Sequence, residues 1–188
     1  MTDEELMAAV CRGDQSAYRT LVSQNLNAIS HYAFRILGNH GDTEDITQEV
    51  FLKLWVNAAQ WQPRKAKLST WLHRITHNLC IDFLRKHKRM TTNSEIGDEE
   101  DSETSNTGTQ ESNDTNYSSS DSRMQLLLAE LHKLPEAQRS AIMLCHFSGF
   151  SNQEAADIMS LSVKALESLL ARARRSLRNT LSNPANDE

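Results

Sequence analysis

The chain has 188 residues, a net charge of −5 and a mean hydropathy of −0.57. Its unbroken apolar runs are short, as at residues 141–145, whereas a membrane-spanning helix needs about 18 residues, so a transmembrane helix is excluded. The acidic N-terminus MTDEELMAAV predicts no secretory signal peptide. Cys11, Cys80 and Cys145 are odd in number and widely spaced, which favours a reduced cytoplasmic protein over a disulfide scaffold. With six Gly and three Pro, the chain is expected to be mostly helical.

An acidic, polar stretch divides the chain into two blocks. Residues 91–122 contain nine Asp or Glu, no Lys or Arg and almost no apolar side chain. Such a stretch buries too little apolar surface to offset its ordering entropy, and it is long for a loop. We therefore predict a disordered linker at 91–122 between domains at 1–90 and 123–182. Without the nine acids the rest of the chain has a net charge of +4, so the domains are neutral to basic.

The first block is predicted to be helical throughout. Apolar side chains recur at helical spacing over residues 3–12 and 15–37, and Gly38 and Asn39 then stop the second helix. Asp42 is expected to cap a third helix. One face of that helix is apolar (Ile46, Val50, Phe51, Leu54 and Ala58), and the opposite face carries Asp45, Gln48, Glu49 and Leu52. A polar loop at 62–69 precedes a fourth helix, expected over 70–88.

Basic residues are concentrated between positions 61 and 90. Eight Lys or Arg and a single Asp give this stretch a charge of +7. Such a cluster attracts phosphate through counterion release, although a charged run can also be only a solvated face. Trp61 is suited either to stacking on a nucleic-acid base or to packing in the core, and the sequence favours neither. Trp71 is expected in the core.

The second block begins with two expected helices, over 124–133 and from Pro135 to near Phe147, with Gly149 ending the second. Ser151 and Glu154 then form the pattern of a capping box at the start of a short helix.

The end of the second block is typical of a helix-turn-helix. A turn at 160–162 leads into a final helix that Ser162 is expected to cap, and the second helix of such a motif enters the DNA major groove. Ser160 is expected at a positive φ usually reserved for Gly, at a cost of about 1 kcal/mol. A plain antiparallel helix pair is the alternative.

Three segments together resemble bacterial sigma factors. DTEDITQEVF at 42–51, followed by Leu54 and Trp55, and WLHRITHNLCIDFLR at 71–85 resemble region 2 of that family. LPEAQR at 134–139, with the helix-turn-helix, resembles region 4. A chain with regions 2 and 4 alone is similar to the extracytoplasmic-function (ECF, group IV) sigma factors of the sigma-70 family.

The resemblance implies an all-α fold of two small helical domains and a cytoplasmic RNA polymerase sigma factor. Such a factor directs promoter-specific initiation of a stress or envelope-response regulon. The implied partners are core RNA polymerase, promoter DNA and an anti-sigma factor. The resemblance implies no enzyme activity, no cofactor and no metal.

The resemblance also assigns residues to three surfaces. Core polymerase binding falls on Asp45, Gln48, Glu49 and Leu52. Binding to the −10 element falls on Trp61, Arg64, Lys65, Lys67, Arg74, His77, Asn78, Arg85, Lys86 and Lys88. Binding to the −35 element falls on Ser162, Lys164, Glu167, Ser168, Arg172, Arg174 and Arg175.

The last helix departs from the family pattern at Glu167 and Leu169, where many relatives have Lys and Arg. Leu169 occupies a plausible core position. Glu167 is suited to accept from a cytosine amino group, or to pair locally with Lys164 or Arg174, and local pairing is favoured. A promoter sequence therefore cannot be transferred from relatives.

Two alternatives to the sigma-factor interpretation remain. His73, His77 and Cys80 have the spacing of one helix face and could ligate zinc, although the sequence shows no fourth ligand. The helix-turn-helix could also belong to a stand-alone DNA-binding regulator that never contacts polymerase. For the linker, a further hypothesis is that its nine acids mimic nucleic-acid phosphates inside the polymerase.

Overall fold

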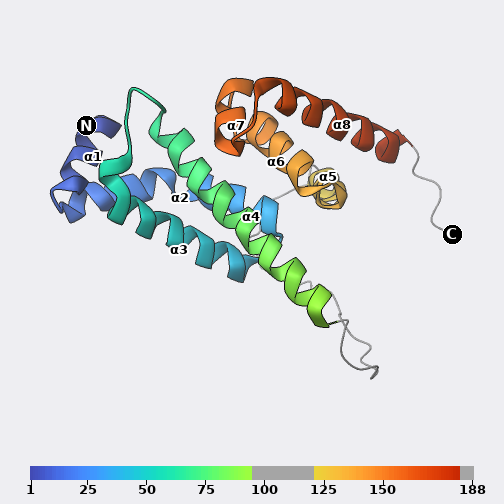
Figure 1. The fold of residues 1–188 in the computed structure, drawn as a ribbon, viewed down its shortest axis with the longest axis horizontal. Helices are drawn as coiled ribbons and strands as arrows, with labels where there is room; N and C mark the ends of the chain where they lie inside the picture. The colour runs from blue at the N-terminus through green and yellow to red at the C-terminus, as the bar shows by residue number, and fades with distance from the viewer. Residues whose placement is uncertain (95–120, 183–188) are drawn as a thin grey trace.

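The computed structural model describes residues 1–94 and 121–182, and all regular elements in this part of the chain are helical. In chain order these are α1 (Asp3–Cys11), α2 (Gln15–Leu37), α3 (His40–Asn57), the 3-10 turn η1 (Ala58–Gln60), α4 (Leu68–Ser94), α5 (Asp121–Lys133), α6 (Glu136–Ile142), the π-helical turn η2 (Met143–Phe147), α7 (Asn152–Met159) and α8 (Val163–Ser182) (Figure 1). The predicted all-α class is confirmed. None of the described helices is long and apolar enough to cross a membrane.

The predicted boundaries of α2 agree with the structure because both of its ends carry strong signals. The Asp14 carboxylate accepts hydrogen bonds from the backbone N–H groups of Ser16 and Ala17, at 2.8 and 3.2 Å, which satisfies donors that have no partner within the helix. At the other end Gly38 adopts a left-handed conformation with φ of 82°, which stops the helix.

The third helix begins earlier than predicted, and Asp42 is not its cap. Asn39 is the cap instead, because its side-chain oxygen accepts from the backbone N–H of Asp42 at 2.8 Å. Gly41 and Asp42 therefore lie inside the first turn, where an acidic side chain suits the positive end of the helix dipole.

The fourth helix is longer than predicted at both ends. It begins at Leu68 rather than at residue 70, and it continues to Ser94 rather than ending at 88. Residues 91–94 of the predicted linker are therefore helical, and α5 likewise begins at Asp121, inside the linker's other end. The predicted disorder of the remaining linker, at 95–120, lies outside the described residues.

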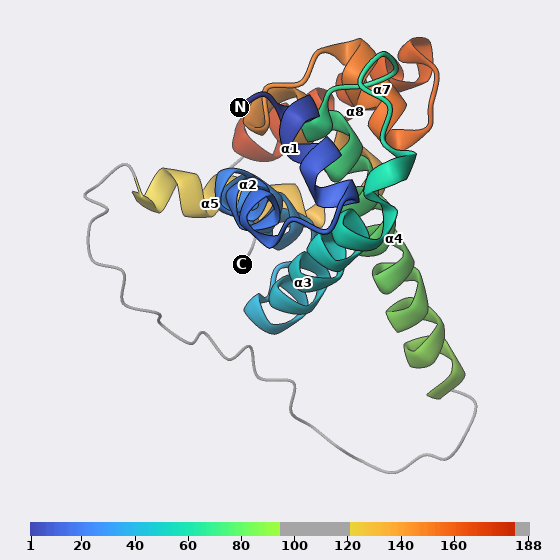
Figure 2. The same ribbon diagram turned by 90° about the vertical axis from the view of Figure 1, so that its left-hand side faces the viewer.

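α2 is the central helix of the N-terminal bundle. Figure 2 views this helix nearly end-on, with α1, α3 and α4 around it, and α2 contacts all three. Its inward side chains Leu21, Ile29 and Ile36 are at most 1% exposed. Burial of such side chains contributes about 1.5–3 kcal/mol each and holds α3 and α4 in fixed orientations.

The C-terminal bundle is built from α5 to α8. α8 packs against α6 and α7 through Leu166 and Leu170, which are buried. Ala155 and Ala156 on α7 are fully buried, as expected for a helix that approaches its neighbours closely.

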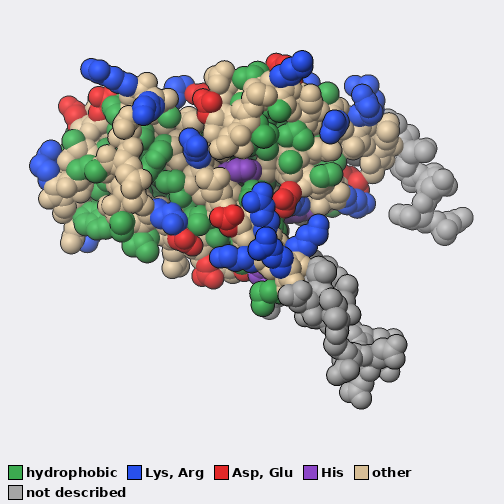
Figure 3. All heavy atoms as spheres, in the orientation of Figure 1, with side chains coloured by type: hydrophobic (Ala, Val, Ile, Leu, Met, Phe, Trp, Pro, Cys, Tyr) green, Lys and Arg blue, Asp and Glu red, His purple; other side chains and the backbone are tan. Residues whose placement is uncertain are grey.

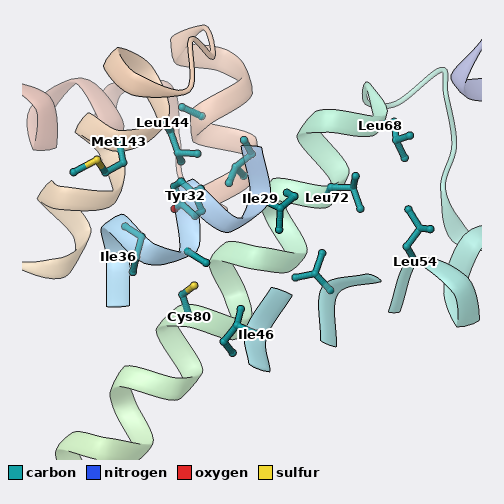
Figure 4. Close-up of a cluster of buried hydrophobic side chains, with 14 of the residues drawn as sticks. Ile29, Tyr32, Ile36, Ile46, Leu54, Leu68, Leu72, Cys80, Met143 and Leu144 are labelled. Atoms are coloured by element: carbon teal, nitrogen blue, oxygen red, sulfur yellow. The ribbon is translucent and has the colours of Figure 1, made fainter. Parts of the chain in front are cut away.

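The two bundles share one buried core. Tyr32 of α2, Cys80 of α4, and Met143 and Leu144 of η2 are all buried, and they lie in one cluster (Figure 4). α7 also contacts α4 directly. The helix-turn-helix therefore packs against the bundle that carries the basic helix.

Candidate nucleic-acid interface

The polar face of α3 lies on the surface, as the sequence predicts. Asp45, Gln48 and Glu49 are exposed, while Val50 and Leu54 on the apolar face of the helix are buried and anchor it. Leu52 is 60% exposed, and Val56, which the sequence analysis did not include, is 68% exposed one turn further on. An exposed apolar pair beside carboxylates is typical of a protein-binding surface.

Basic side chains follow the loop before α4 and continue along that helix. Arg64, Lys65 and Lys67 in the loop, Arg74 and Asn78 in the first half of α4, and Arg85, Lys86 and Lys88 in its second half are all exposed. Figure 3 shows Lys and Arg side chains gathered over the second half of α4. These predicted residues lie on an accessible surface that suits a phosphate backbone.

Trp61 is partly buried and packs against the core. Its indole Nε1 donates a hydrogen bond to the carbonyl oxygen of Ala66 at 3.1 Å, which ties the two ends of the basic loop together. The structure thus gives Trp61 a packing role, the second of the two possibilities that the sequence left open, with part of its side chain still exposed.

The expectation that His77 belongs to the exposed basic surface is wrong in this arrangement. Its side chain is 6% exposed, and its Nδ1 lies 3.0 Å from the hydroxyl oxygen of Tyr32. Burial, and secondarily the charge of Arg85, lowers the pKa of His77 to about 4, so the ring is neutral at physiological pH. The sequence did contain a signal of this burial, because His77 lies one turn after His73 and one turn before Cys80, on the face of α4 that is buried.

The zinc alternative is not supported. The carbonyl oxygen of Ser69 accepts a hydrogen bond from His73 Nδ1 at 2.8 Å, and Cys80 is fully buried, with its thiol pKa raised to about 12 by that burial. Within residues 1–94 and 121–182, no group of three or more His, Cys, Asp or Glu side chains is arranged to hold a metal ion.

The helix-turn-helix forms as predicted. Ser151 and Glu154 make the reciprocal capping box of α7, and Ser160 adopts the left-handed conformation with φ of 56°. The Ser162 hydroxyl then accepts from the backbone N–H of Ala165 at 3.1 Å and so caps α8. A plain antiparallel helix pair, the alternative interpretation, would not require this strained and sharply reversed turn.

α8 presents a polar face to solvent. Leu166, Leu170 and Ala173 are buried and fix its rotation. The residues predicted to read DNA are all exposed: Ser162, Lys164, Glu167, Ser168, Arg172, Arg174 and Arg175. Leu169 is only partly buried, at the edge of the core.

Local pairing of Glu167 is contradicted. Among the described side chains, neither Lys164 nor Arg174 forms an ion pair with it. Arg174 turns instead to His146 of η2, with 3.1 Å between Nη2 and the imidazole Nε2. Glu167 therefore remains available on the face that would meet DNA, and His146 is a neighbour that the sequence analysis missed.

Comparison with known proteins decides between the sigma-factor interpretation and the stand-alone regulator. The family description "Sigma-70 region 2" matches residues 21–90, and "Sigma-70, region 4" matches residues 124–177. The ECF RNA polymerase sigma-E factor of Haemophilus influenzae is 30% identical over 96% of both chains. That of Escherichia coli is 30% identical over 95% of this chain and 94% of its own. The chain belongs to the ECF RNA polymerase sigma factors of the sigma-70 family. The ECF sigma factor SigE of Mycolicibacterium smegmatis is a further relative, 31% identical over 99% of this chain and 72% of its own.

Solved structures show that this sigma factor also shares the family's fold. The structure of CnrH in complex with the cytosolic domain of CnrY has a TM-score of 0.69 and 25% identity, covering 96% of this chain and 97% of that one. The structure of the sigma factor RpoE in complex with the anti-sigma factor NepR, from Bartonella quintana, has a TM-score of 0.67 and 26% identity, covering 88% and 96%.

The family match includes the surfaces described above. The polar face of α3, the basic loop and most of α4 lie within the region 2 match, and α7 and most of α8 lie within the region 4 match. This sigma factor is a transcription initiation factor, and its partners are core RNA polymerase and promoter DNA.

Proposed function

We propose that this sigma factor uses three surfaces in one initiation complex, at promoters of a stress or envelope-response regulon. The α3 face holds core RNA polymerase, the basic loop and α4 bind and open the −10 element, and α8 reads the −35 element as duplex. The observation that carries the proposal is the exposed face of α8, a helix anchored by its buried side chains. On this face the side chains of Lys164, Glu167, Arg172 and Arg175 have no hydrogen-bond or ion-pair partner among the described residues, whereas Ser162, Ser168 and Arg174 bond to Ala165, Lys164 and His146.

The α3 surface combines charge with exposed apolar area. Asp45 and Glu49 supply carboxylates, while Leu52 and Val56 supply apolar surface that would be removed from water on binding. Apolar side chains at the centre of an interface account for much of its affinity. Core polymerase is the partner that this surface would bind, and the proposal extends the predicted set by Val56.

The α4 surface suits a partly single-stranded target. Its Lys and Arg side chains would hold the phosphate backbone, and Asn78 offers an amide for a base edge. Opening of the duplex exposes bases that cost a few kcal/mol to unstack, which contacts with this surface would offset. His77 supports this surface from inside rather than by touching DNA.

A test of the α3 surface compares two exposed leucines. Leu52→Ala should weaken binding to core polymerase by about tenfold, since truncation of an interfacial apolar anchor costs about 1–2 kcal/mol. Leu26→Ala on α2 is the matched control, because Leu26 is 41% exposed and lies outside the proposed surfaces. Equal affinities of the two variants for core polymerase, measured by fluorescence anisotropy, would remove Leu52 from the interface.

The decisive experiment for the whole proposal is transcription by reconstituted polymerase. The purified chain is mixed with sigma-free core polymerase and genomic DNA, and transcript 5′ ends are mapped. Discrete new starts that share two upstream boxes are expected. If the chain neither binds core polymerase nor produces new starts, the proposed roles of all three surfaces fail. The mapped boxes would also reveal which base Glu167 faces.

An anti-sigma factor is a further proposed partner. The similar RpoE of Bartonella quintana was solved in complex with the anti-sigma factor NepR. An inhibitor that covers two surfaces at once would suit a chain with two DNA-reading bundles. We place the protein in the cytoplasm, where polymerase and promoters are, and assign it no catalytic reaction of its own.

A further inference from the structure

The side chain of Arg174 is held at one edge of the exposed face of α8. A rotation of about 100° per residue places Arg174 next to buried Leu170 and in line with Glu167, about 10 Å away along the helix. Arg172 lies on the opposite edge. The Nη2 atom of Arg174 lies 3.1 Å from the imidazole Nε2 of His146 in η2. The Arg174 guanidinium is therefore directed toward η2, away from the centre of the face that is proposed to bind duplex DNA.

The donor and acceptor roles in this contact determine the protonation state of the ring. A guanidinium only donates hydrogen bonds, so Nε2 of His146 is the acceptor, and the proton of the neutral ring is then on Nδ1. A protonated imidazole has two N–H donors and no acceptor, and its charge repels a neighbouring guanidinium. The contact between Arg174 and His146 therefore requires a neutral ring and is lost when the ring binds a proton.

The backbone around His146 is anchored, so its partner on α8 is the side chain that can move. On one side, the Cys145 thiol donates to the side-chain oxygen of Asn152 on α7, at 3.7 Å. On the other side, the guanidinium carbon of Arg35 lies 4.9 Å from the centre of the Phe147 ring, a cation–π contact that ties η2 to α2. A long arginine side chain gains rotamer freedom when such a contact is lost. Loss of the contact would therefore free the arginine rather than displace η2.

The charged and titratable groups that face η2 are mostly cationic. They are Arg174 of α8, Glu154 of α7, His31 and Arg35 of α2, Lys67 of the basic loop and His73 of α4, beside Cys145 of η2 itself. The Arg139 side chain of α6 bonds instead to His132 of α5. Within the described chain no carboxylate forms an ion pair with His146, and Glu154 is held by Lys67 at 2.9 Å. A proton on His146 would thus join a group of cations, which favours release of the arginine partner.

The position of Arg174 along α8 suits a contact with a backbone phosphate. It lies about 16 Å along the helix axis from Val163, where α8 begins. In a helix-turn-helix the base edges are read by the N-terminal residues of the second helix, so a cation this far along is placed for the backbone. A phosphate contact adds affinity for any duplex and carries no sequence information. An arginine held away from the backbone therefore lowers non-specific binding and leaves base readout unchanged.

We propose that His146 is a positioning residue for DNA binding by α8: its neutral ring withholds Arg174 from the DNA backbone, and loss of their contact releases the guanidinium to bind a phosphate. His146 thereby limits the affinity of the chain for non-specific duplex DNA. This role rests on the proposed function of α8 and deepens it, because it states when one of the α8 cations acts.

Two substitutions of His146 test this role in the full-length chain. His146→Ala removes the acceptor, whereas His146→Gln offers a carbonyl oxygen that can accept from Arg174 and does not titrate. Because His146 is exposed, neither change should unfold the C-terminal bundle. Binding to a fluorescent random-sequence duplex is measured by anisotropy across a salt series at about pH 7.5, where histidine is mostly neutral.

His146→Ala should steepen the fall of log K with log salt by about 0.9, the value for one added phosphate contact, and His146→Gln should keep the slope of the parent. A double variant identifies the released group, because adding Arg174→Gln to His146→Ala should remove the extra slope. Equal slopes for His146→Ala and the parent would overturn the inference, and so would an extra slope that survives the double substitution.

The pH dependence separates a positioning role from a merely structural one. Lowering the pH from about 8 to about 5.5 should steepen the salt slope of the parent by about 1–2 more than that of His146→Gln, because Arg174 is released and the His146 ring itself becomes a cation. The other histidines are common to both chains, so the difference between them reports His146 alone. Identical pH profiles of the parent and the Gln variant would contradict the proposed role.

Arg172→Gln, on the opposite edge of α8, distinguishes failure of this role from failure of the proposed function. It should weaken duplex binding at both pH values by removing a cation that has no partner in the described protein. If it does so while the His146 variants behave like the parent, only the role of His146 is overturned. If neither Arg172→Gln nor the His146 variants change the affinity for the duplex, the proposed function of α8 fails as well.

Discussion

His77 shows how a single buried imidazole links stability to pH. Its pKa is lowered from 6.5 to about 4 in the fold, first by burial and then by Arg85, so the folded chain holds the neutral ring. Above pH 6.5 the lowered pKa does not change the free energy of unfolding, because the His77 ring is neutral in the unfolded chain too. As pH falls from 6.5 toward 4, His77 becomes protonated in the unfolded chain but stays neutral in the folded chain, so the free energy of unfolding decreases.

The prediction is that acidification over this interval lowers the free energy of unfolding by up to about 3 kcal/mol through His77 alone. His77→Asn removes the titrating group and keeps a polar atom for the Tyr32 hydroxyl. Urea unfolding at a series of pH values should therefore give a shallower acid slope for the variant than for the parent. Superimposable slopes would show that His77 is not buried in the neutral form.

The same residue marks what sequence reasoning missed at this scale. His77 follows Arg74 and precedes Arg85, and the surrounding charge favoured a surface assignment. The position of His77 around the helix axis buries it instead, because α4 buries the side that carries His73 and Cys80. Exposed sites such as Arg64 and Lys86 were predictable from charge alone. The partner of Arg174 was not, because His146 lies 28 positions away and only tertiary packing brings them together.

At the scale of elements, the turn of the helix-turn-helix stores local strain. Ser160 has φ of 56° and ψ of 42°, a conformation that costs a residue with a Cβ about 1 kcal/mol or more. Ser160→Gly should relieve this cost and raise the melting temperature by about 2–4 °C, measured by circular dichroism. Ser160→Ala retains the Cβ and should not gain. A glycine variant that melts at or below the parent would show that the strain is already offset elsewhere.

Helix existence was predictable, whereas some helix ends were not. The apolar spacing of α2 and its two strong caps, Asp14 and Gly38, are compatible with only one pair of helix boundaries. For α3 two residues three positions apart, Asn39 and Asp42, have side chains that can cap a helix, and only the backbone geometry selects the first. α4 continues beyond its last core residues to Ser94, where composition alone predicted linker. Capping residues therefore predict the boundary of a helix from its sequence only where a single candidate cap is present.

At the scale of the molecule, the chain separates its charges by segment. The two bundles carry the cations that DNA binding needs, and their junction pairs some of these with the acids of α7. The fold of each bundle was accessible from periodicity and capping. Their mutual packing was not, since it depends on Tyr32, Phe150 and Glu154, which belong to different local patterns and meet only in three dimensions.

The nine acids at 91–122 should control non-specific DNA binding through net charge. Their replacement by Gln or Asn changes the net charge of the chain from −5 to +4, and only Asp121, the first residue of α5, lies within a described helix. Removal of this repulsion should raise the affinity for random duplex DNA on the order of tenfold at low salt. The gain should fade as ionic strength rises and the screening length falls to about 8 Å near physiological salt. Affinity titrations of parent and variant across a salt series measure both effects. A gain that persists undiminished in high salt would mean that the acids act through a specific contact rather than through the field of the whole chain.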